Sequence, residues 1–321
     1  MVVQVFHLNL FWGLLAIALG HMVGGVVIAL ASAQGPCMGI PQMVQSRGQF
    51  GRYGALLIVF FAALIYIGFF ISNIVLAGKS IVGIAPSVPV PASILIGALS
   101  ATAIGVIGYR FIHTLNRIGT WVMGGALLAG FIYIFAHDLP ADFLTRGSFN
   151  LSGWLATVSL AALWQIAFAP YVSDYSRYLP ADVPVAATFW TTYLGTVLGS
   201  SLSFIFGAVA VLATPVGMDT MEAVKLATGS IGPLMLVLFL LSVISHNALN
   251  LYGAVLSLIT LVQIPFMNTP LYVGPISEHI NGADLSWVVG LVITSPLYWW
   301  LANRDSAYKR RLSSGKLATS L

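Results

Sequence analysis

Long apolar runs dominate the chain, and short links that are polar or rich in proline separate them. A helix that spans a bilayer needs about 20 mostly apolar residues, and eight stretches meet that length. They cover residues 8–33, 53–78, 90–112, 119–137, 151–170, 187–213, 232–260 and 284–303. None of them shows the alternation of apolar and polar positions that is typical of barrel strands. The pattern therefore predicts an all-α, polytopic membrane protein with about eight spans.

Composition supports this class and excludes others. Charged residues make up 7% of the 321 positions, against about 25% in soluble domains, so a soluble fold is excluded. The single cysteine, Cys37, excludes an intrachain disulfide and a zinc site built from cysteines. The net charge of +4 does not indicate a nucleic-acid partner. The first 33 residues lack the basic start and short apolar core of a signal peptide, so we expect a spanning helix there.

Lysine and arginine in short links predict the orientation. The links after the first, third and fifth runs carry Arg47, Arg52, Arg110, Arg117 and Arg177, and those after the second, fourth and sixth carry Lys79, Arg146 and Lys225. The first set is therefore predicted to be cytoplasmic.

The basic tail, residues 304–321, is also expected to contact cytoplasmic headgroups. Eight spans would place it outside, so we expect an odd number of spans to be absent or hidden between about residues 257 and 284.

Several blocks of sequence point to one family. They are GIPQMVQSRGQFGRYGALL (39–57), IYIGFFISN (65–73), APYVSDYSRYLP (169–180), NLYGAVLSL (250–258), IPFMNTPLYVGP (264–275) and GADLSWVVGLVITSPLYWW (282–300). In this order they resemble the nucleobase:cation symporter-1 family, which includes purine–cytosine permeases and allantoin permeases. The resemblance implies a LeuT-like bundle of inverted repeats. It also implies that the chain, a single transporter domain over 1–321, lacks the first helix and an internal segment near 263–264.

Candidate substrate contacts follow from the resemblance and from the chemistry of a flat heterocycle. Such a solute needs aromatic faces for stacking and amide groups for its polar edges. Phe69 and Asn73 are four residues apart and share a helix face, and the resemblance assigns substrate contacts to them and to Trp164 and Asn250. Gln165 adjoins Trp164 and joins the candidates. An interhelical hydrogen bond for Asn73 and a place in the interfacial aromatic belt for Trp164 are the alternatives.

Candidate coupling residues lie in the polar stretch 242–250 of the seventh run. The resemblance places Ser245 at one hydroxyl position of a sodium site, while Ile244 occupies the neighbouring hydroxyl position. His246 is titratable and suits proton coupling, or it is a hydrogen-bonded structural residue. The coupling ion is therefore either sodium or a proton, and the sequence does not decide between them. No other cofactor or metal is expected.

Four charged residues are candidates for gating or topology. Arg47 and Arg52 either anchor the orientation of the chain or form a cytoplasmic gate with Asp174 or Arg177. Asp174 and Arg177 are three residues apart and are expected to pair at a helix end, either in a gate or as a solvated cap.

The sequence therefore predicts a cation-coupled transporter for nucleobases or a related heterocycle such as allantoin, resident in the cell membrane. The alternative is a truncated fragment of such a permease that does not transport. No phosphate loop, metal-ligand spacing or nucleophile–base pair stands out, so an enzyme is not expected. The oligomeric state is left open.

Overall fold

The computed structural model describes residues 2–263, and beyond them 268–269, 272–273, 275–279, 288–289, 292 and 296. Side chains at 47–48, 51–53, 109, 259–263, 268–269 and 272 are not described. Seven helices within the described residues are long and apolar enough to cross a membrane. They correspond to the first seven predicted runs; the eighth, 284–303, lies outside the described residues except at four positions.

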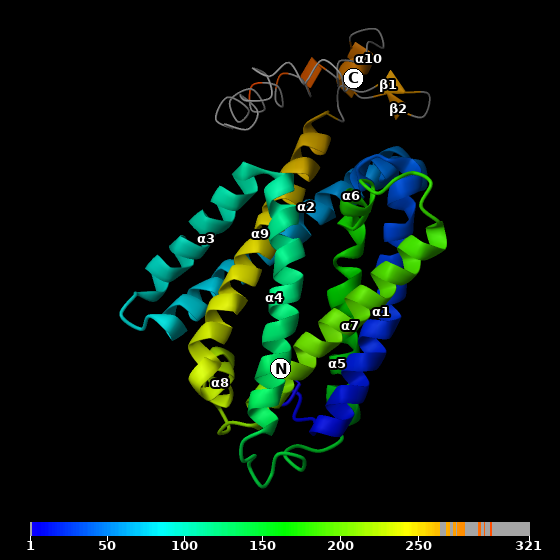
Figure 1. Cartoon of the computed structure of the whole chain (residues 1–321). Helices are drawn as coiled ribbons and strands as arrows, with labels where there is room; N and C mark the ends of the chain where they lie inside the picture. The colour runs from blue at the N-terminus through cyan, green and yellow to red at the C-terminus, as the bar shows by residue number, and fades with distance from the viewer. Residues whose placement is uncertain are drawn as a thin grey trace.

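The described elements follow one another along the chain (Figure 1). They are α1 (Leu10–Met38), α2 (Gln42–Ile84), α3 (Val90–Ile107), α4 (Tyr109–Phe135), α5 (Leu151–Ile166), η1 (Ala169–Tyr171), α6 (Ser173–Ser176), α7 (Val185–Leu212), α8 (Thr220–Ala227), η2 (Gly229–Ile231), α9 (Gly232–Gln263), β1 (Asn268–Thr269), β2 (Tyr272–Val273) and α10 (Pro275–His279). The two short strands pair antiparallel, with Asn268 opposite Val273.

The link predicted between the first two runs, 8–33 and 53–78, is much shorter than expected. Gly39 ends α1 in the left-handed region at φ 64°, which costs a glycine little, and α2 begins at Gln42 directly after Pro41. Arg47 and Arg52 therefore belong to the first turns of α2 rather than to a link. Their side chains lie outside the described part of the structure, so their gating role stays a prediction.

The link expected between the third and fourth runs is also corrected. A single residue, Gly108 at φ 104°, separates α3 from α4. Arg110 and Arg117 therefore lie within α4. A glycine at positive φ turns the chain sharply between two helices without a loop, and the apolar pattern alone did not reveal this.

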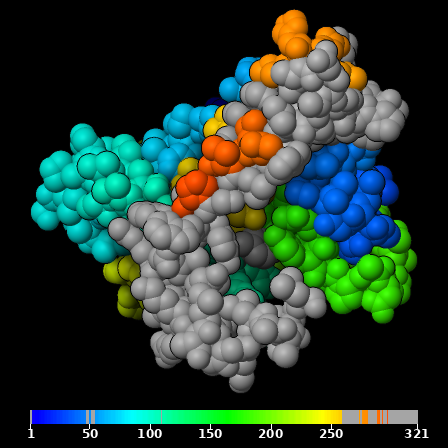
Figure 2. Space-filling view, turned by 90° about the horizontal axis from the view of Figure 1, so that it is seen from above, coloured from blue at the N-terminus to red at the C-terminus, as the bar shows by residue number. Residues whose placement is uncertain are grey.

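Packing divides the long helices into two groups. α1 packs against α5 and α7, while α9 packs against α2, α3 and α4, and α8 contacts both α7 and α9. Viewed from above, the cyan surface of α3 lies at one edge and the blue and green surfaces of α1 and α7 at the other (Figure 2). Because lipid gives apolar helices no hydrophobic drive to associate, close contact between small residues stabilises such a bundle.

Glycines bring α1 against α5. A Cβ at Gly20 would collide with the carbonyl oxygen of Val158 and lie 2.6 Å from the Cβ of Ala161. Alanine normally improves a helix interior by about 1 kcal/mol over glycine, but overpacking costs about 1–3 kcal/mol. We therefore expect Gly20→Ala to lower the thermal unfolding midpoint in detergent.

The matched control is Gly68→Ala on α2, where an added Cβ meets no atom within 4 Å. That variant should unfold at or above the wild-type temperature. An equal or higher midpoint for Gly20→Ala would contradict close packing of α1 on α5.

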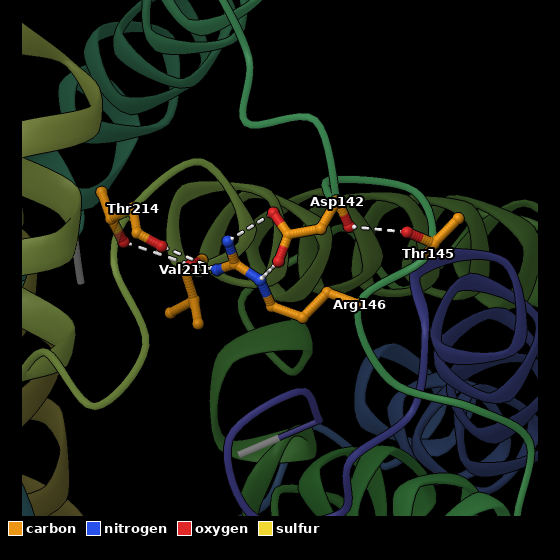
Figure 3. A network of polar contacts seen from close by, with 5 residues as sticks. All are labelled: Asp142, Thr145, Arg146, Val211 and Thr214. Atoms are coloured by element: carbon orange, nitrogen blue, oxygen red, sulfur yellow. Dashed lines mark hydrogen bonds and ion pairs between the residues drawn. The ribbon is translucent and has the colours of Figure 1, made fainter.

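Arg146 ties the loop after α4 to the end of α7 (Figure 3). Its Nε and Nη2 donate to the Asp142 carboxylate over 2.8 and 2.9 Å, and its Nη1 donates to the Thr214 carbonyl over 2.7 Å. The bonds from Arg146 lower the pKa of Asp142 below its ordinary value. The arginine fork thus satisfies a carboxylate and the free carbonyl end of a helix together.

Replacement of Arg146 should reveal this tie. We expect the unfolding midpoint to be highest for the wild type, lower for Arg146→Lys and lowest for Arg146→Met. The ammonium group of lysine keeps the charge but cannot reproduce the bidentate hydrogen bonds of the guanidinium group. The pairing contributes stability above the ordinary carboxyl pKa and loses it as the pH falls through the lowered pKa of Asp142. The gap between wild type and Arg146→Met should therefore narrow on acidification, and a gap that widens would contradict the pairing.

Candidate functional site

The fifth spanning helix is interrupted, whereas the apolar pattern predicted one continuous run over 151–170. α5 ends at Ile166, the 3-10 turn η1 follows around Pro170, and the chain resumes as the short α6. Pro170 has no N–H to donate and disfavours a continuous helix; it was the signal in the sequence. Irregular backbone inside a bilayer needs partners from neighbouring helices. Gln42 supplies them, because its Nε2 donates to the Ala169 carbonyl over 2.7 Å and its Oε1 accepts from the Ser173 N–H over 2.8 Å.

A cavity of about 180 Å³ lies beside this interruption. We call it the central cavity. Helices α1, α2, α5, α7 and α9 and the interrupted segment each contribute to its wall. It is lined by Ile28, Phe69, Trp164, Gln165, Phe168, Tyr171, Thr196, Ser200 and His246. Discontinuous helices near the bilayer midplane form the substrate sites of many secondary transporters.

Aromatic rings form much of the wall. The rings of Phe69 and Trp164 meet edge to face, with centroids 6.0 Å apart and planes at 86°. Phe168 and His246 are nearly parallel, with centroids 5.9 Å apart and planes at 27°. Phe168, Tyr171 and His246 were not predicted as stacking residues, although His246 was a candidate for coupling. Rings in several orientations suit a flat solute that stacks on one face and meets ring edges on its rim.

Gln165 supplies a fixed amide at this cavity. Its side chain is buried, and its Nε2 donates to the main-chain carbonyl of Thr196 over 3.0 Å. The same nitrogen lies 3.4 Å from Nδ1 of His21, a fully buried residue. These contacts hold the amide in one orientation, as a group that reads the edge of a ligand requires.

The structure does not bring the two candidate asparagines into this wall. Asn73 and Asn250 are both buried, and neither lines the central cavity. Asn250 donates its Nδ2 to Oδ1 of Asn247 over 3.3 Å, and Asn247 donates to the Phe70 carbonyl over 3.2 Å. An interhelical hydrogen bond between α9 and α2 is thus present next to them. Their contact with substrate stays a prediction.

The two coupling candidates lie at a second cavity of about 580 Å³ between α3, α4 and α9. We call it the α4 cavity. Ser245 donates to Oδ1 of Asn116 over 2.9 Å, and both residues line this space. His246 lines the α4 cavity and the central cavity alike. The coupling roles of Ser245 and His246 stay predictions.

Asp174 stabilises the start of α2 instead of pairing with Arg177. Its Oδ1 accepts the main-chain N–H of Gln42 over 2.8 Å. The Nε of Arg177 donates to the main-chain carbonyl of Asp174 over 3.3 Å, and its Nη2 donates to the Tyr178 hydroxyl over 2.9 Å. Burial raises the pKa of Asp174, while the bond from Gln42 and the charge of Arg177 oppose that rise. A carboxylate suits a helix start, where free N–H groups and the helix dipole favour negative charge.

Comparison with known proteins assigns the chain to a family. The family described as "Permease for cytosine/purines, uracil, thiamine, allantoin" matches residues 2–268. The chain is 30% identical to "Putative purine-cytosine permease YxlA" of Bacillus subtilis over 413 aligned residues, which cover 96% of this chain and 90% of the relative. The chain belongs to this permease family, nucleobase:cation symporter-1. It is an integral, multi-pass membrane protein of a transporter family and not an enzyme.

More distant members of the family share most of the chain. "Purine-cytosine permease fcyB" of Emericella nidulans is 24% identical over 79% of this chain and 53% of its own length. "Vitamin B6 transporter TPN1" of Saccharomyces cerevisiae is 23% identical over 74% of this chain and 44% of its own length. The chain therefore spans about half the length of these two relatives.

The alignment with the Bacillus protein is longer than this chain, 413 against 321 residues, so it includes positions of the relative that have no counterpart here.

Solved structures show the same fold. The transporter Mhp1 of the nucleobase-cation-symport-1 family, in a closed conformation with bromovinylhydantoin bound, has a TM-score of 0.67 at 18% identity and covers 94% of this chain and 69% of its own. Its inward-facing form has a TM-score of 0.61. The predicted fold class, a LeuT-like helical bundle, is confirmed.

Proposed function

We propose that this chain is a cation-coupled secondary transporter for a nucleobase or a related small heterocycle, such as cytosine, a purine or allantoin. The observation that carries the proposal is the central cavity beside the interrupted helix, where aromatic rings and a fixed amide converge. Pockets for drug-sized ligands measure about 300–1,000 Å³. A cavity of about 180 Å³ therefore suits a solute of one or two small rings.

The cavity offers each kind of contact that such a solute needs. Trp164 and Phe69 provide ring faces and edges for a flat molecule. Gln165 and the hydroxyls of Thr196 and Ser200 provide hydrogen-bonding groups for polar ring atoms. Removal of a base from water leaves its polar edges to be satisfied by the protein, because an unpaired buried polar group costs about 1–3 kcal/mol.

The names of the relatives support the substrate class. They include purine-cytosine permeases and a vitamin B6 transporter, and a solved neighbour holds bromovinylhydantoin. All of these names refer to small ring compounds. We also propose that the chain lies in the plasma or inner membrane, where it would take up solute from outside the cell.

Uptake by cells that express the chain tests this function. We expect radiolabelled cytosine, adenine, uracil or allantoin to accumulate above vector controls, and unlabelled substrate to compete. Replacement of sodium by choline should stop uptake if Ser245 and its neighbours hold sodium, and a protonophore should stop it if protons drive the step. Accumulation of none of the four compounds, by a chain shown to be inserted, would contradict the proposed substrates.

A second candidate function is a permease-derived chain that binds a heterocycle without transporting it. The alignment that exceeds the length of this chain favours this candidate, because the relative has positions that this chain lacks. Binding by the purified chain together with absent uptake would support it. Uptake that saturates with substrate concentration would eliminate it.

A further inference from the structure

Four cavities adjoin one another within the bundle. Beyond the central cavity and the α4 cavity, a third of about 240 Å³ lies along α7 and is lined by Val3, Trp164, Phe204 and Gly207 among others. We call it the α7 cavity. A fourth of about 340 Å³, the Arg146 cavity, lies beside Val3, Arg146 and Val211.

Neighbouring cavities in this series share side chains. Val3 and Val211 line both the Arg146 cavity and the α7 cavity. Trp164 lines both the α7 cavity and the central cavity. His246 lines both the central cavity and the α4 cavity. Each space therefore has at least one wall side chain in common with the next.

The series runs from one side of the bundle to the other. The α7 cavity reaches Thr220, the first residue of α8. The end of α4 lies on this same side, because the Ser230 N–H beside α8 donates to the Tyr133 hydroxyl over 3.3 Å. The α4 cavity is lined by the first half of α4, from Phe111 to Met123, and thus lies toward the opposite side. Figure 1 shows α8 at the bottom of the bundle and the start of α4 at the top.

We propose that these cavities form one water-accessible route across the bundle, that Trp164 divides it on the α8 side, and that His246 divides it on the opposite side. The inference rests on the proposed transport function and assigns its pathway. The substrate would reach the central cavity from the α8 side past Trp164 and leave it past His246, or travel the reverse way.

The packing of the two dividers suits this role. Trp164 touches Phe69 and Phe204 only through tilted, edge-type ring contacts, at centroid distances of 6.0 and 5.8 Å. Its side chain remains 44% exposed, so space lies beside it. Among the described rings, only that of Phe168 pairs with the imidazole ring of His246. Each of the two side chains thus lies at the boundary between two cavities.

Sided labelling of introduced cysteines tests the route. In a Cys37→Ser background, we choose Gly207→Cys in the α7 cavity and Gly119→Cys in the α4 cavity, where an added Cβ meets no atom within 4 Å. A membrane-impermeant thiol reagent reacts with thiolates in water and not with thiols in lipid. We expect Gly207→Cys to react from the α8 side only, and Gly119→Cys from the other side only, in oriented vesicles.

Matched controls lie on the same two helices. Gly195 on α7 shares a face with the exposed Leu202, and Gly124 on α4 shares a face with the exposed Trp121. An added Cβ is unhindered at both glycines. Gly195→Cys and Gly124→Cys should react about tenfold more slowly than the route positions.

A cysteine in the central cavity tests the dividers. Ser200→Cys should react about tenfold faster from the α8 side when Trp164→Ala is added, and about tenfold faster from the other side when His246→Ala is added. Trp164→Phe, which disturbs packing less, should give a smaller increase on the same side.

The outcomes separate the route from the transport function, because labelling does not require uptake. Equal reactivity of the route cysteines and their controls would overturn the route, even where uptake persists. Equal reactivity of Gly207→Cys and Gly119→Cys from both sides would overturn the dividers. Sided labelling in a chain that takes up no substrate would support the route and count against the proposed function.

Discussion

Replacement of Trp164 by alanine is expected to weaken the binding of a nucleobase to the purified chain more than any other single change in the central cavity. Trp164 presents the largest ring in that wall and lies between Phe69 and Phe204. Stacking of a base on an aromatic side chain contributes about 1–3 kcal/mol by alanine substitution. The dissociation constant should therefore rise about 5- to 150-fold, as measured by equilibrium binding of a radiolabelled base in detergent.

The dissociation constants of two further variants are compared with that of Trp164→Ala. Trp121→Ala is the matched control, because Trp121 is 81% exposed on α4 and lines neither the central nor the α7 cavity. It should bind as the wild type does. Trp164→Phe should fall between wild type and alanine because it keeps a smaller ring. Equal dissociation constants for Trp164→Ala and Trp121→Ala would remove Trp164 from the site.

Loss of the Asp174 carboxylate is expected to open the bundle on the side where α6 meets the start of α2. The carboxylate accepts the Gln42 N–H, while Gln42 also bonds to both ends of the interrupted segment. A hydrogen bond to a charged group contributes about 1.5–3 kcal/mol, so its loss shifts an open–closed equilibrium about tenfold or more. Asp174→Leu should therefore speed thiol labelling of Ser200→Cys from that side and slow uptake. Asp182→Leu, at an exposed aspartate in the same connection, should change neither.

The buried carboxyl group of Asp174 should make the stability of the fold depend on pH. Burial raises the pKa of Asp174 above its unfolded value, so the folded state holds the proton more tightly. The cost of the buried charge is present above the raised pKa and disappears as the pH falls through it. Asp174→Asn keeps an acceptor for Gln42 and removes the charge. Its unfolding midpoint should exceed that of the wild type at neutral pH, and the difference should vanish in acid. A difference that is constant with pH would contradict the account.

The sequence predicted the seven spanning helices of the described residues, because length and apolarity mark a helix that can cross a bilayer. The eighth predicted run, 284–303, stays a prediction. The sequence also predicted Phe69, Trp164 and Gln165, which the structure brings to one cavity. Phe69 and Trp164 are far apart along the chain, and the family resemblance brought them together. Helical spacing alone could connect Phe69 only with residues on its own helix, such as Asn73.

The features that escaped prediction depend on contacts between distant segments. Pro170 signalled an interruption, but only the bonds from Gln42 show how the bundle tolerates it. Asp174 and Arg177 look like partners at a spacing of three, yet the start of α2 competes for the carboxylate and takes it. Asn73 and Asn250 have the chemistry of substrate contacts, but their place relative to the cavity depends on the rotation of two helices. A one-dimensional pattern does not fix that rotation.

A structure of the full chain with bound ligand, soaked with the base that it binds or takes up, tests the central claim most directly. The account predicts density for one flat ligand beside Trp164 and Phe69, with a polar edge within hydrogen-bonding distance of Gln165. Ligand density at another place, or an unfilled central cavity at a saturating concentration of a base that binds, would contradict it.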